Sequence, residues 1–512
     1  MKKEKEINIL QSYAEQIFSQ GKDRYGKKQT PLLVDGLDLE EQVPLMSKDE
    51  NSEYVISNLA YHQNFHRFLA GLSAVTGKEE YVQRAKQEVD FHFSKLQHEN
   101  GLLHWGGHHY IDLKTKQPAA RDIHELKNVF PFYDLMWEVD SSATDKYINA
   151  FWNAHVLDWS KLDINRHGFY DKEIGAVWEN DFQDPEPFFA ARGLSFINCG
   201  TDLIYAGGFL YNQTGQQEVL DWTKRLIKQY VKARHPETGL GVYMYSQPKK
   251  RKEEPDDINH PQFTFSTYGD RAQRQFGPEF GDIALEGNLL TPSRGRSIYG
   301  KNAFIQLELA QKLGKEGSEI LQDTVRGMEA YYNYAYDRKT NMLTPMWVDG
   351  TDLTNYEIKR YGYFGKKGDR FRAQPAGPLL LYSYLKGFLM TENKCFWEMV
   401  RGIFAGQGLG DPGTKPGARV NLKQNTSCQD PLVLLSLLAL YRETFAGSYL
   451  EMAEEIGDNI YENNYYQGFF LTSKEDKKVR IDTIAPLALL KLVVVEEDSY
   501  DQVPEYNTGG GY

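Results

Sequence analysis

The stretch KEEYVQRAKQEVDFHFSKLQHENGLLHWGG, residues 78–107, contains the pattern that decides the fold. Its first part interleaves polar and apolar side chains as an amphipathic helix does, and Asn, Gly and His then mark the place where such a helix would stop. Aromatic and β-branched residues that suit a short strand follow the turn. The stretch therefore predicts a helix, a turn and a short strand, in that order.

The same unit recurs further along the chain, which indicates a repeat. Helical patterns run into similar turns at residues 143–173, 217–245, 317–347 and 449–473. A period of about 65 residues is long enough for two helices and their connections, and the 512 residues of the chain then give about seven helical hairpins. We therefore predict an all-α dominated fold, an (α/α)7 toroid or barrel of helical hairpins with short β elements near the active site.

The domain organisation follows from the absence of a linker-like tract. We expect residues 1–503 to form a single catalytic domain and residues 504–512, which are rich in glycine, to form a flexible tail. The charged segment 247–262 breaks the repeat and is interpreted as a solvated loop insertion.

Composition and charge narrow the class of protein. With 41% hydrophobic and 25% charged residues the chain is globular, and its net charge of −12 provides no basic footprint for nucleic acid. The most apolar stretch, residues 431–441, is too short to span a bilayer. The N-terminal residues show helical spacing and no apolar leader, and the three cysteines show no CxxC spacing. These features lead us to expect a soluble cytoplasmic protein that needs neither nucleic acid nor membrane.

Four candidate site residues lie within sixty positions. They are His108 in HWGGHHYID, Glu125 in RDIHELKNVF, and the pair Arg166 and His167 in DINRHGFYDKE. Two imidazoles and a carboxylate form a mixed nitrogen and oxygen set that suits a divalent transition metal. We expect Glu125 near the start of a helix. Because His108 and His167 follow equivalent turns of neighbouring hairpins, a ring would place them at the same end of the barrel.

The motifs WGGHHYIDL, HELKNVFPFYDLMWEVD and DINRHGFYD together resemble polysaccharide lyase family 2, the pectate lyases with an (α/α)7 barrel. The resemblance implies that His108, Glu125 and His167 bind manganese, cobalt or nickel, and that Arg166 is the Brønsted base. It also implies β-elimination on polygalacturonate. The choice of His108 over His109 rests on its position directly after Gly107.

The identity of the base remains open on chemical grounds, because the guanidinium of arginine stays protonated in proteins. Arg166 would then bind a carboxylate, and Lys172, Lys301 or a metal-bound hydroxide would take the proton. For the substrate carboxylates, the arginine-rich tract of residues 268–304 offers Arg271, Arg294 and Arg296. Trp178 is a candidate platform for a sugar ring.

Other functions remain open on the sequence. A helical toroid also suits a sugar epimerase, which needs paired histidines, or a glycoside hydrolase, which needs paired carboxylates. A noncatalytic oligosaccharide-binding protein is the third class. Among lyases, the expected cytoplasmic location favours an exolytic enzyme that releases unsaturated digalacturonate, with an endolytic pectate lyase as the alternative. The sequence gives no oligomeric state.

Overall fold

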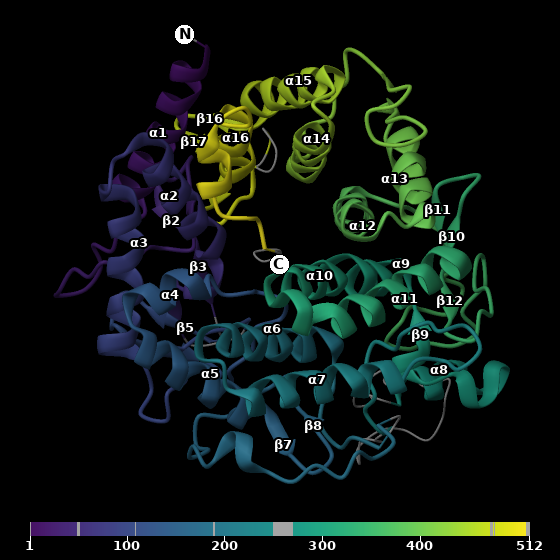
Figure 1. Ribbon diagram of the computed structural model, residues 1–512. Helices are drawn as coiled ribbons and strands as arrows, with labels where there is room; N and C mark the ends of the chain where they lie inside the picture. The colour runs from purple at the N-terminus through teal and green to yellow at the C-terminus, as the bar shows by residue number, and fades with distance from the viewer. Residues whose placement is uncertain are drawn as a thin grey trace. The chain divides into compact units, whose positions relative to one another are not determined.

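The computed structural model describes residues 2–48, 52–107, 109–187, 190–248, 270–471, 475 and 477–507. Helices make up most of these residues and the strands are short (Figure 1). The chain divides into two compact units, and the ends of the chain belong to the same one. The first unit comprises Met1–Phe151, Gly168–Ile174 and Gly408–Tyr512, and the second comprises Trp152–His167 and Gly175–Gln407.

The first unit is built on pairs of helices. Helix α2 packs on α3 and α14 packs on α15, while α16 near the C-terminus packs on both α1 and α2. The pairing of α1 with α16 joins the two ends of the chain. The helices are α1 (Lys2–Gln20), α2 (Gln63–Thr76), α3 (Glu80–Phe91), α4 (Tyr133–Val139), α5 (Ser141–His155, whose last residues belong to the second unit), α14 (Pro431–Thr444), α15 (Gly447–Asn464) and α16 (Ala485–Val493).

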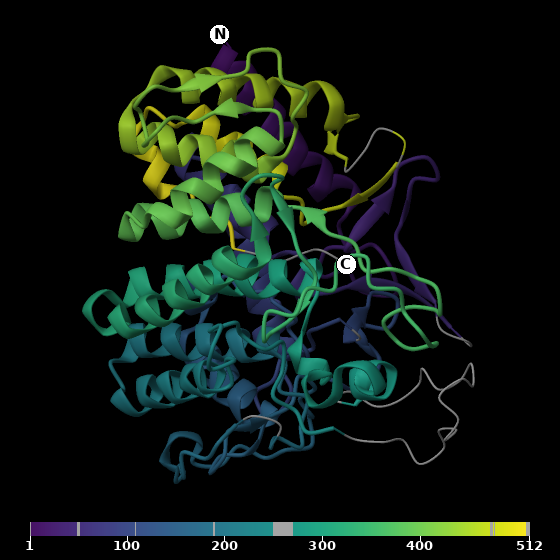
Figure 2. The ribbon, with the colours of Figure 1, turned by 90° about the vertical axis from the view of Figure 1, so that its right-hand side faces the viewer.

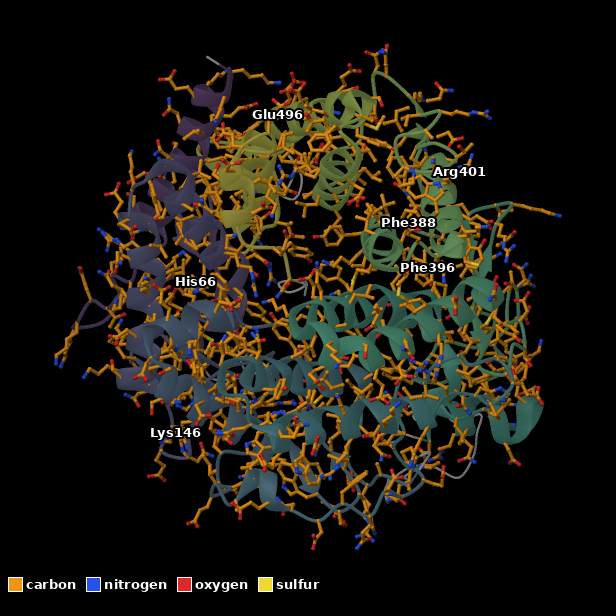
Figure 3. All side chains as sticks on the ribbon, viewed as in Figure 1. His66, Lys146, Phe388, Phe396, Arg401 and Glu496 are labelled. Carbon is orange, nitrogen blue, oxygen red and sulfur yellow. The ribbon has the colours of Figure 1, made fainter. Side chains whose placement is uncertain are left out.

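The second unit repeats this arrangement with three hairpins, α6 with α7, α10 with α11, and α12 with α13. Aromatic side chains fill the last of these interfaces: Phe388 of α12 meets Trp397 of α13, and Phe396 meets Tyr384 (Figure 3). The helices are α6 (Ile197–Thr214), α7 (Gln217–Lys232), α8 (Arg271–Phe280), α9 (Pro292–Gly295), α10 (Ala303–Leu313), α11 (Ser318–Ala335), α12 (Pro378–Thr391) and α13 (Lys394–Gly406).

The strands form small antiparallel sheets at the ends of helices (Figure 2). In the first unit, four strands pair in the order β3-β4-β5-β6 and three in the order β18-β1-β2. The strands of the first unit are β1 (Gly36–Asp38), β2 (Val43–Pro44), β3 (Met46–Lys48), β4 (Glu53–Ser57), β5 (His109–Asp112), β6 (Gln117–Ala120), β14 (Gly410–Asp411), β15 (Asn421–Leu422), β16 (Tyr465–Tyr466), β17 (Phe469–Phe470) and β18 (Lys478–Arg480). Those of the second are β7 (Val156–Asp158), β8 (Asp163–Ile164), β9 (Leu289–Leu290), β10 (Tyr336–Asp337), β11 (Met342–Leu343), β12 (Met346–Trp347) and β13 (Gln374–Pro375).

The sequence pattern predicted this architecture because helix, turn and strand signals agree at each hairpin. Gly77 ends α2 and Gly215 ends α6, both in the left-handed conformation that glycine adopts without strain. Strands of two or three residues directly follow some of the helices, as β7 follows α5 and β10 follows α11. The predicted helix-dominated class of hairpins with short strands is therefore confirmed. Closure into a ring of seven hairpins and a single domain over 1–503 stay predictions.

Two further expectations concern the ends of the chain and its apolar segments. Within the predicted tail, Tyr506 and Asn507 are buried and Glu505 pairs with Lys491 at 2.8 Å, while residues 508–512 lie outside the described residues. Among the helices that the structure describes, none is both long and apolar enough to cross a membrane.

Candidate active site

Glu125 lies in an irregular segment, residues 121–132, which is held by backbone bridges to distant residues. We expected a helix to begin here, and this expectation is wrong, because the next helix begins only at Tyr133. Lys127 and Asn128 adopt left-handed conformations with φ of 55° and 62°, and Pro131 lacks the amide that a helix would use. The position of Glu125 is therefore fixed by tertiary contacts.

The residues that precede His108 lie directly against Glu125. Gly106 forms a parallel bridge with Glu125, whose amide donates to the carbonyl of Trp105 at 3.4 Å. Gly106 has a φ of 134°, and a Cβ at this position would lie 2.2 Å from the carbonyl oxygen of Glu125. This close approach therefore requires glycine. His108 itself lies outside the described residues, so its role as a ligand stays a prediction.

Gly168, the residue that follows His167, bridges to the same segment. The backbones of His124 and Gly168 exchange two hydrogen bonds, both of 2.9 Å. Gly168 directly follows His167, whose own amide donates to the side-chain oxygen of Asn165 at 3.1 Å. The bridges thus hold Gly106, two residues before His108, and Gly168, directly after His167, against the segment that contains Glu125.

The carboxylate of Glu125 is 1% exposed, and the ammonium of Lys127 lies 3.1 Å from its Oε2. A buried carboxylate needs a compensating charge, and a nearby ammonium provides part of it. Sequence reasoning missed Lys127, although its place two residues after Glu125 was a usable signal. A carboxylate on a segment next to two histidine positions gives the donor types that divalent transition metals take in proteins.

His109, the alternative ligand to His108, is held by hydrogen bonds at both ring nitrogens. Its Nδ1 donates to the carbonyl of Arg121 at 2.7 Å, and its Nε2 lies 2.7 Å from Nδ1 of His104. Burial lowers the pKa of His109, and burial followed by repulsion from His109 lowers that of His104 to about 3. Both rings are therefore held in the packing of this segment, and the choice between His108 and His109 as the ligand stays a prediction.

Arg166 belongs to the second unit, where its guanidinium lies over the ring of Phe196 at 5.2 Å. Phe196 contacts the ring of Tyr243 at 5.2 Å, and the guanidinium of Arg294 lies 4.5 Å from that tyrosine ring. Burial raises the pKa of Tyr243, while the charges of Arg294 and Arg166 oppose this rise. A chain of ring contacts, with the two aromatic rings edge to face, therefore links the predicted base to a predicted substrate-binding arginine.

Arg271 and Arg294 converge on one buried carboxylate, Glu286. Nε of Arg271 donates to Glu286 Oε2 at 2.9 Å, and Nη2 of Arg271 donates to Oε1. Arg294 donates to the carbonyl and to Oε1 of Glu286 at 2.6 and 3.3 Å. Burial lowers the pKa of Arg294, although the Glu286 charge opposes this effect. Sequence reasoning missed Glu286, whose apolar neighbours Leu285 and Leu289 were the available signal.

The remaining predicted substrate contacts lie in different surroundings. The guanidinium of Arg296 donates to the side-chain oxygen of Gln374. Trp178 packs edge-on against Trp152 at 5.2 Å, and its carbonyl accepts from Nε1 of Trp222 at 3.0 Å. A tryptophan in such a cluster contributes first to packing. Its role as a sugar platform stays a prediction.

Comparison with known proteins identifies the family of this chain. The model of the family described as periplasmic pectate lyase matches residues 30–512. A pectate disaccharide-lyase from Dickeya dadantii (strain 3937) is 34% identical over 505 residues, which cover 94% of this chain and 88% of that protein. Among solved structures, a sugar epimerase from a ruminal bacterium has 10% identity and a TM-score of 0.46, covering 96% of this chain and 98% of that chain. A cellobiose 2-epimerase from Bacillus thermoamylovorans B4167 has 12% identity and a TM-score of 0.43, with the same shares covered.

The description of the matching family as periplasmic contradicts the cytoplasmic location that we expected, and this prediction is wrong. The expectation rested on the helical spacing of the N-terminal residues and on three cysteines without CxxC spacing. Helix α1 buries Leu10, Tyr13 and Ile17, so that spacing reflects the packing of this helix and carries no information about the compartment.

Proposed function

Since the chain belongs to the family of periplasmic pectate lyases, we propose that it cleaves polygalacturonate by β-elimination and releases unsaturated digalacturonate from chain ends. The family assignment makes the protein a polysaccharide lyase and favours this class over the epimerase, hydrolase and noncatalytic binding functions. The exolytic mode is supported by the relative from Dickeya dadantii, which is named a pectate disaccharide-lyase.

The observation that carries the proposal is the set of backbone bridges around Glu125. Gly106 bridges to Glu125, and Gly168 bridges to His124. These bridges support the proposal, because they hold backbone close in sequence to His108 and His167 against the Glu125 segment. They fit a metal held by His108, Glu125 and His167, because a carboxylate and two imidazoles are suitable donors for manganese, cobalt or nickel.

β-Elimination removes the C5 proton of a galacturonate and breaks the bond from C4 to the bridging oxygen, which leaves a double bond between C4 and C5. The difficulty lies in the C6 carboxylate, whose charge disfavours loss of the neighbouring proton. When bound, a divalent metal neutralises that carboxylate and acidifies C5. Glu125 is buried, so water would screen its charge on a bound cation only weakly.

Arg166 is the proposed base, on the strength of the family motif. Its guanidinium lies over the ring of Phe196, and an arginine must lose a proton before it can act as a base. Lys301 is the alternative, because burial lowers its pKa, although Asp202 opposes the effect. Burial also lowers the pKa of Lys172. In this alternative Arg166 binds a substrate carboxylate.

The arginine cluster supports an acidic substrate. One carboxylate, Glu286, faces two guanidinium groups, so the cluster of Arg271, Arg294 and Glu286 retains a net positive charge. Arg271 also lies over the ring of Tyr363, which is 56% exposed and therefore borders solvent. We propose that this cluster binds uronate carboxylates next to the bond that is cleaved.

Substitution of Arg166 tests the assignment of the base. Arg166→Ala and Arg166→Lys are compared with Lys301→Met while the ultraviolet absorbance of the unsaturated product is followed. We expect Arg166→Ala to lower kcat by at least about a hundredfold, the usual contribution of general base catalysis. Near-normal turnover of Arg166→Ala at saturating substrate, together with a large loss in Lys301→Met, would transfer the base role to the lysine.

Product analysis on long polygalacturonate tests the mode of cleavage. An exolytic enzyme releases disaccharide from the first time point, whereas early fragments of intermediate length would indicate an endolytic pectate lyase. Treatment with a chelator, followed by addition of manganese, cobalt or nickel, tests the metal requirement. Activity that is indifferent to the chelator would overturn the metal-dependent mechanism.

A further inference from the structure

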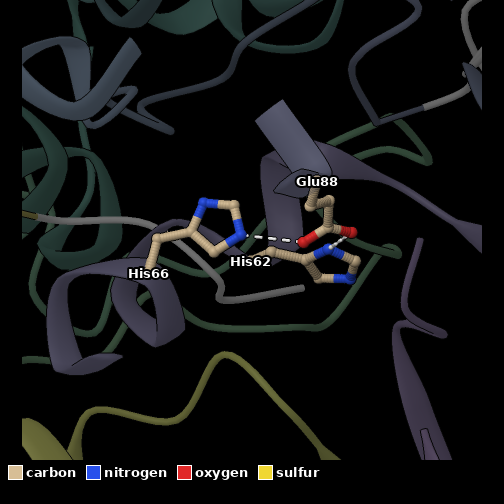
Figure 4. A group of neighbouring side chains, drawn as sticks. All are labelled: His62, His66 and Glu88. Carbon is tan, nitrogen blue, oxygen red and sulfur yellow. Dashed lines mark hydrogen bonds and ion pairs between the residues drawn. The ribbon is translucent and has the colours of Figure 1, made fainter. Parts of the chain in front are cut away.

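A second group of buried titratable side chains lies at the hairpin of α2 and α3 (Figure 4). Nδ1 of His62 lies 2.9 Å from Oε1 of Glu88, and Nε2 of His66 lies 2.8 Å from Oε2 of the same carboxylate. One ligand atom from each of these residues lies within 4.8 Å of the other two. The exposed fraction of each residue is 1% or less.

The local fold explains why these side chains meet. His62 immediately precedes α2, and the amide of His66 donates to the carbonyl of His62 at 2.8 Å, so the two rings lie one turn apart on the same side of the helix. Glu88 comes from α3, the other helix of the hairpin. Two histidines one helical turn apart, with a carboxylate from a neighbouring helix, form a common arrangement of zinc ligands.

The surroundings favour a cation. A second carboxylate lies at the group, because Oδ1 of Asp35 is 3.4 Å from Nε2 of His62. The amide of Leu33 donates to Oε1 of Glu88 at 3.1 Å, and the amide of Asn58 donates to Asp35 at 2.6 Å, so backbone groups fix both carboxylates. Such hydrogen bonds to the residues behind the ligands orient metal sites in proteins.

A cavity adjoins the group and supplies room for a further ligand. It has a volume of about 270 Å³, and His66 and Glu88 form part of its wall together with Lys22 and Arg84. Within the part of the chain that the structure describes, Nδ1 of His66 makes no hydrogen bond although it is buried. A buried polar atom of this kind requires a water molecule or a ligand. The volume is sufficient for water molecules.

We propose that His62, His66 and Glu88 form a second site for a divalent transition metal such as zinc or cobalt. The two imidazoles and the carboxylate provide three protein ligands, and a water molecule from the cavity completes a four-coordinate set. A metal at this place links α2 to α3 and stabilises the first unit. The site shares no ligand with the one proposed at Glu125.

Metal stoichiometry tests this proposal without relying on activity. The full chain is stripped with a chelator, loaded with Co²⁺ and dialysed, and its cobalt content and visible absorption are measured. We expect two cobalt ions per chain in the unmodified protein and one in Glu125→Ala. His66→Gln also retains one ion, while the control His92→Gln, which replaces another buried histidine close to the cluster, retains two.

The outcomes separate this proposal from the proposed function. Binding of one ion that Glu125→Ala abolishes overturns the second site and leaves the lyase mechanism intact. Binding of one ion that Glu125→Ala retains and His66→Gln loses supports the second site and overturns the metal set at Glu125. If His66→Gln fails to fold, as judged by circular dichroism, Glu125→Ala decides alone. In that variant the His62, His66 and Glu88 cluster is intact. Binding of one cobalt ion, with a rise in the melting temperature of the protein, supports the second site. Binding of no cobalt overturns it.

Discussion

Glu88 in the first unit and Glu286 in the second have similar surroundings, since each is a buried glutamate in contact with two basic side chains. Glu88 is 1% exposed and contacts the imidazoles of His62 and His66. Glu286 is fully buried and contacts the guanidinium groups of Arg271 and Arg294. Each cluster therefore consists of one buried carboxylate and two basic side chains. The clusters differ in whether the basic groups are imidazoles or guanidinium groups.

This difference decides what each cluster can bind. An imidazole that loses its proton presents a lone pair to a metal, whereas a guanidinium has only donors. Two carboxylates lie at His62, because Glu88 is 2.9 Å from its Nδ1 and Asp35 is 3.4 Å from its Nε2. Around Glu286 the two guanidinium groups outnumber the carboxylate. The cluster at Glu88 therefore suits a cation, and the cluster at Glu286 suits an anion.

The largest expected effect is that of Glu286→Gln. The amide nitrogen of glutamine only donates, and neither guanidinium accepts, so one contact becomes repulsive and two buried positive charges lose their counter-ion. We expect a loss of about 3–5 kcal/mol in the free energy of unfolding, the usual cost of breaking a buried ion pair. Denaturation by urea, monitored by circular dichroism, measures this loss. A loss below about 1 kcal/mol would show that groups other than Glu286 compensate the charges of Arg271 and Arg294.

The matched substitution Glu88→Gln should cost less in the metal-free protein. An imidazole changes its tautomer and accepts from the new amide, so both histidines keep a hydrogen bond. We expect a loss of about 1–2 kcal/mol, the range for a weakened buried hydrogen bond to a charged group. The same urea denaturation applies. If Glu88→Gln destabilises the protein as much as Glu286→Gln does, the proposed contrast between imidazole and guanidinium is incorrect.

Arg294→Lys tests the proposed role of the arginine cluster in substrate binding. A lysine retains the charge, but it loses the planar fork that contacts Glu286 and the position over Tyr243. We expect kcat/KM for polygalacturonate to fall by about tenfold, which corresponds to ~1.4 kcal/mol, mainly through a higher KM. The measurement is steady-state formation of unsaturated product. A fall in kcat with unchanged KM would place Arg294 at the transition state.

The sequence predicts the helical hairpins well because local signals and tertiary packing agree there. Helices α3, α7, α11 and α15 each occur where polar and apolar residues alternate at helical spacing. The segment around Glu125 was predicted incorrectly for a physical reason. Its bridges to Gly106 and Gly168 depend on residues that are distant in the sequence, and a short apolar pattern does not reveal them.

The candidate site was predicted in part. The histidine and glutamate motifs identified the segments that the backbone bridges bring together, but Lys127, Glu286 and the cluster around Glu88 were missed. A charged residue in a sequence indicates a solvated surface in most cases, and its burial becomes visible only in the structure. The spacing of four residues between His62 and His66 was the one local signal for that cluster. Glu88 lies on the next helix, where spacing gives no information.

The smallest expected effect is that of Arg370→Ala, which serves as the reference for Glu286→Gln, Glu88→Gln and Arg294→Lys. Arg370 pairs with Glu357 at 2.9 Å, and both side chains are exposed, at 49% and 41%. Because water screens such a pair, Arg370→Ala should change the free energy of unfolding by less than about 1 kcal/mol. It should also leave KM for polygalacturonate within about twofold if Arg370 lies outside the substrate path, since that change corresponds to under ~0.5 kcal/mol. A rise in KM as large as that of Arg294→Lys would show that exposed arginines bind the substrate as strongly as the buried cluster does. The contrast between the Glu88 and Glu286 clusters would then account for differences in stability, and it would no longer account for substrate binding.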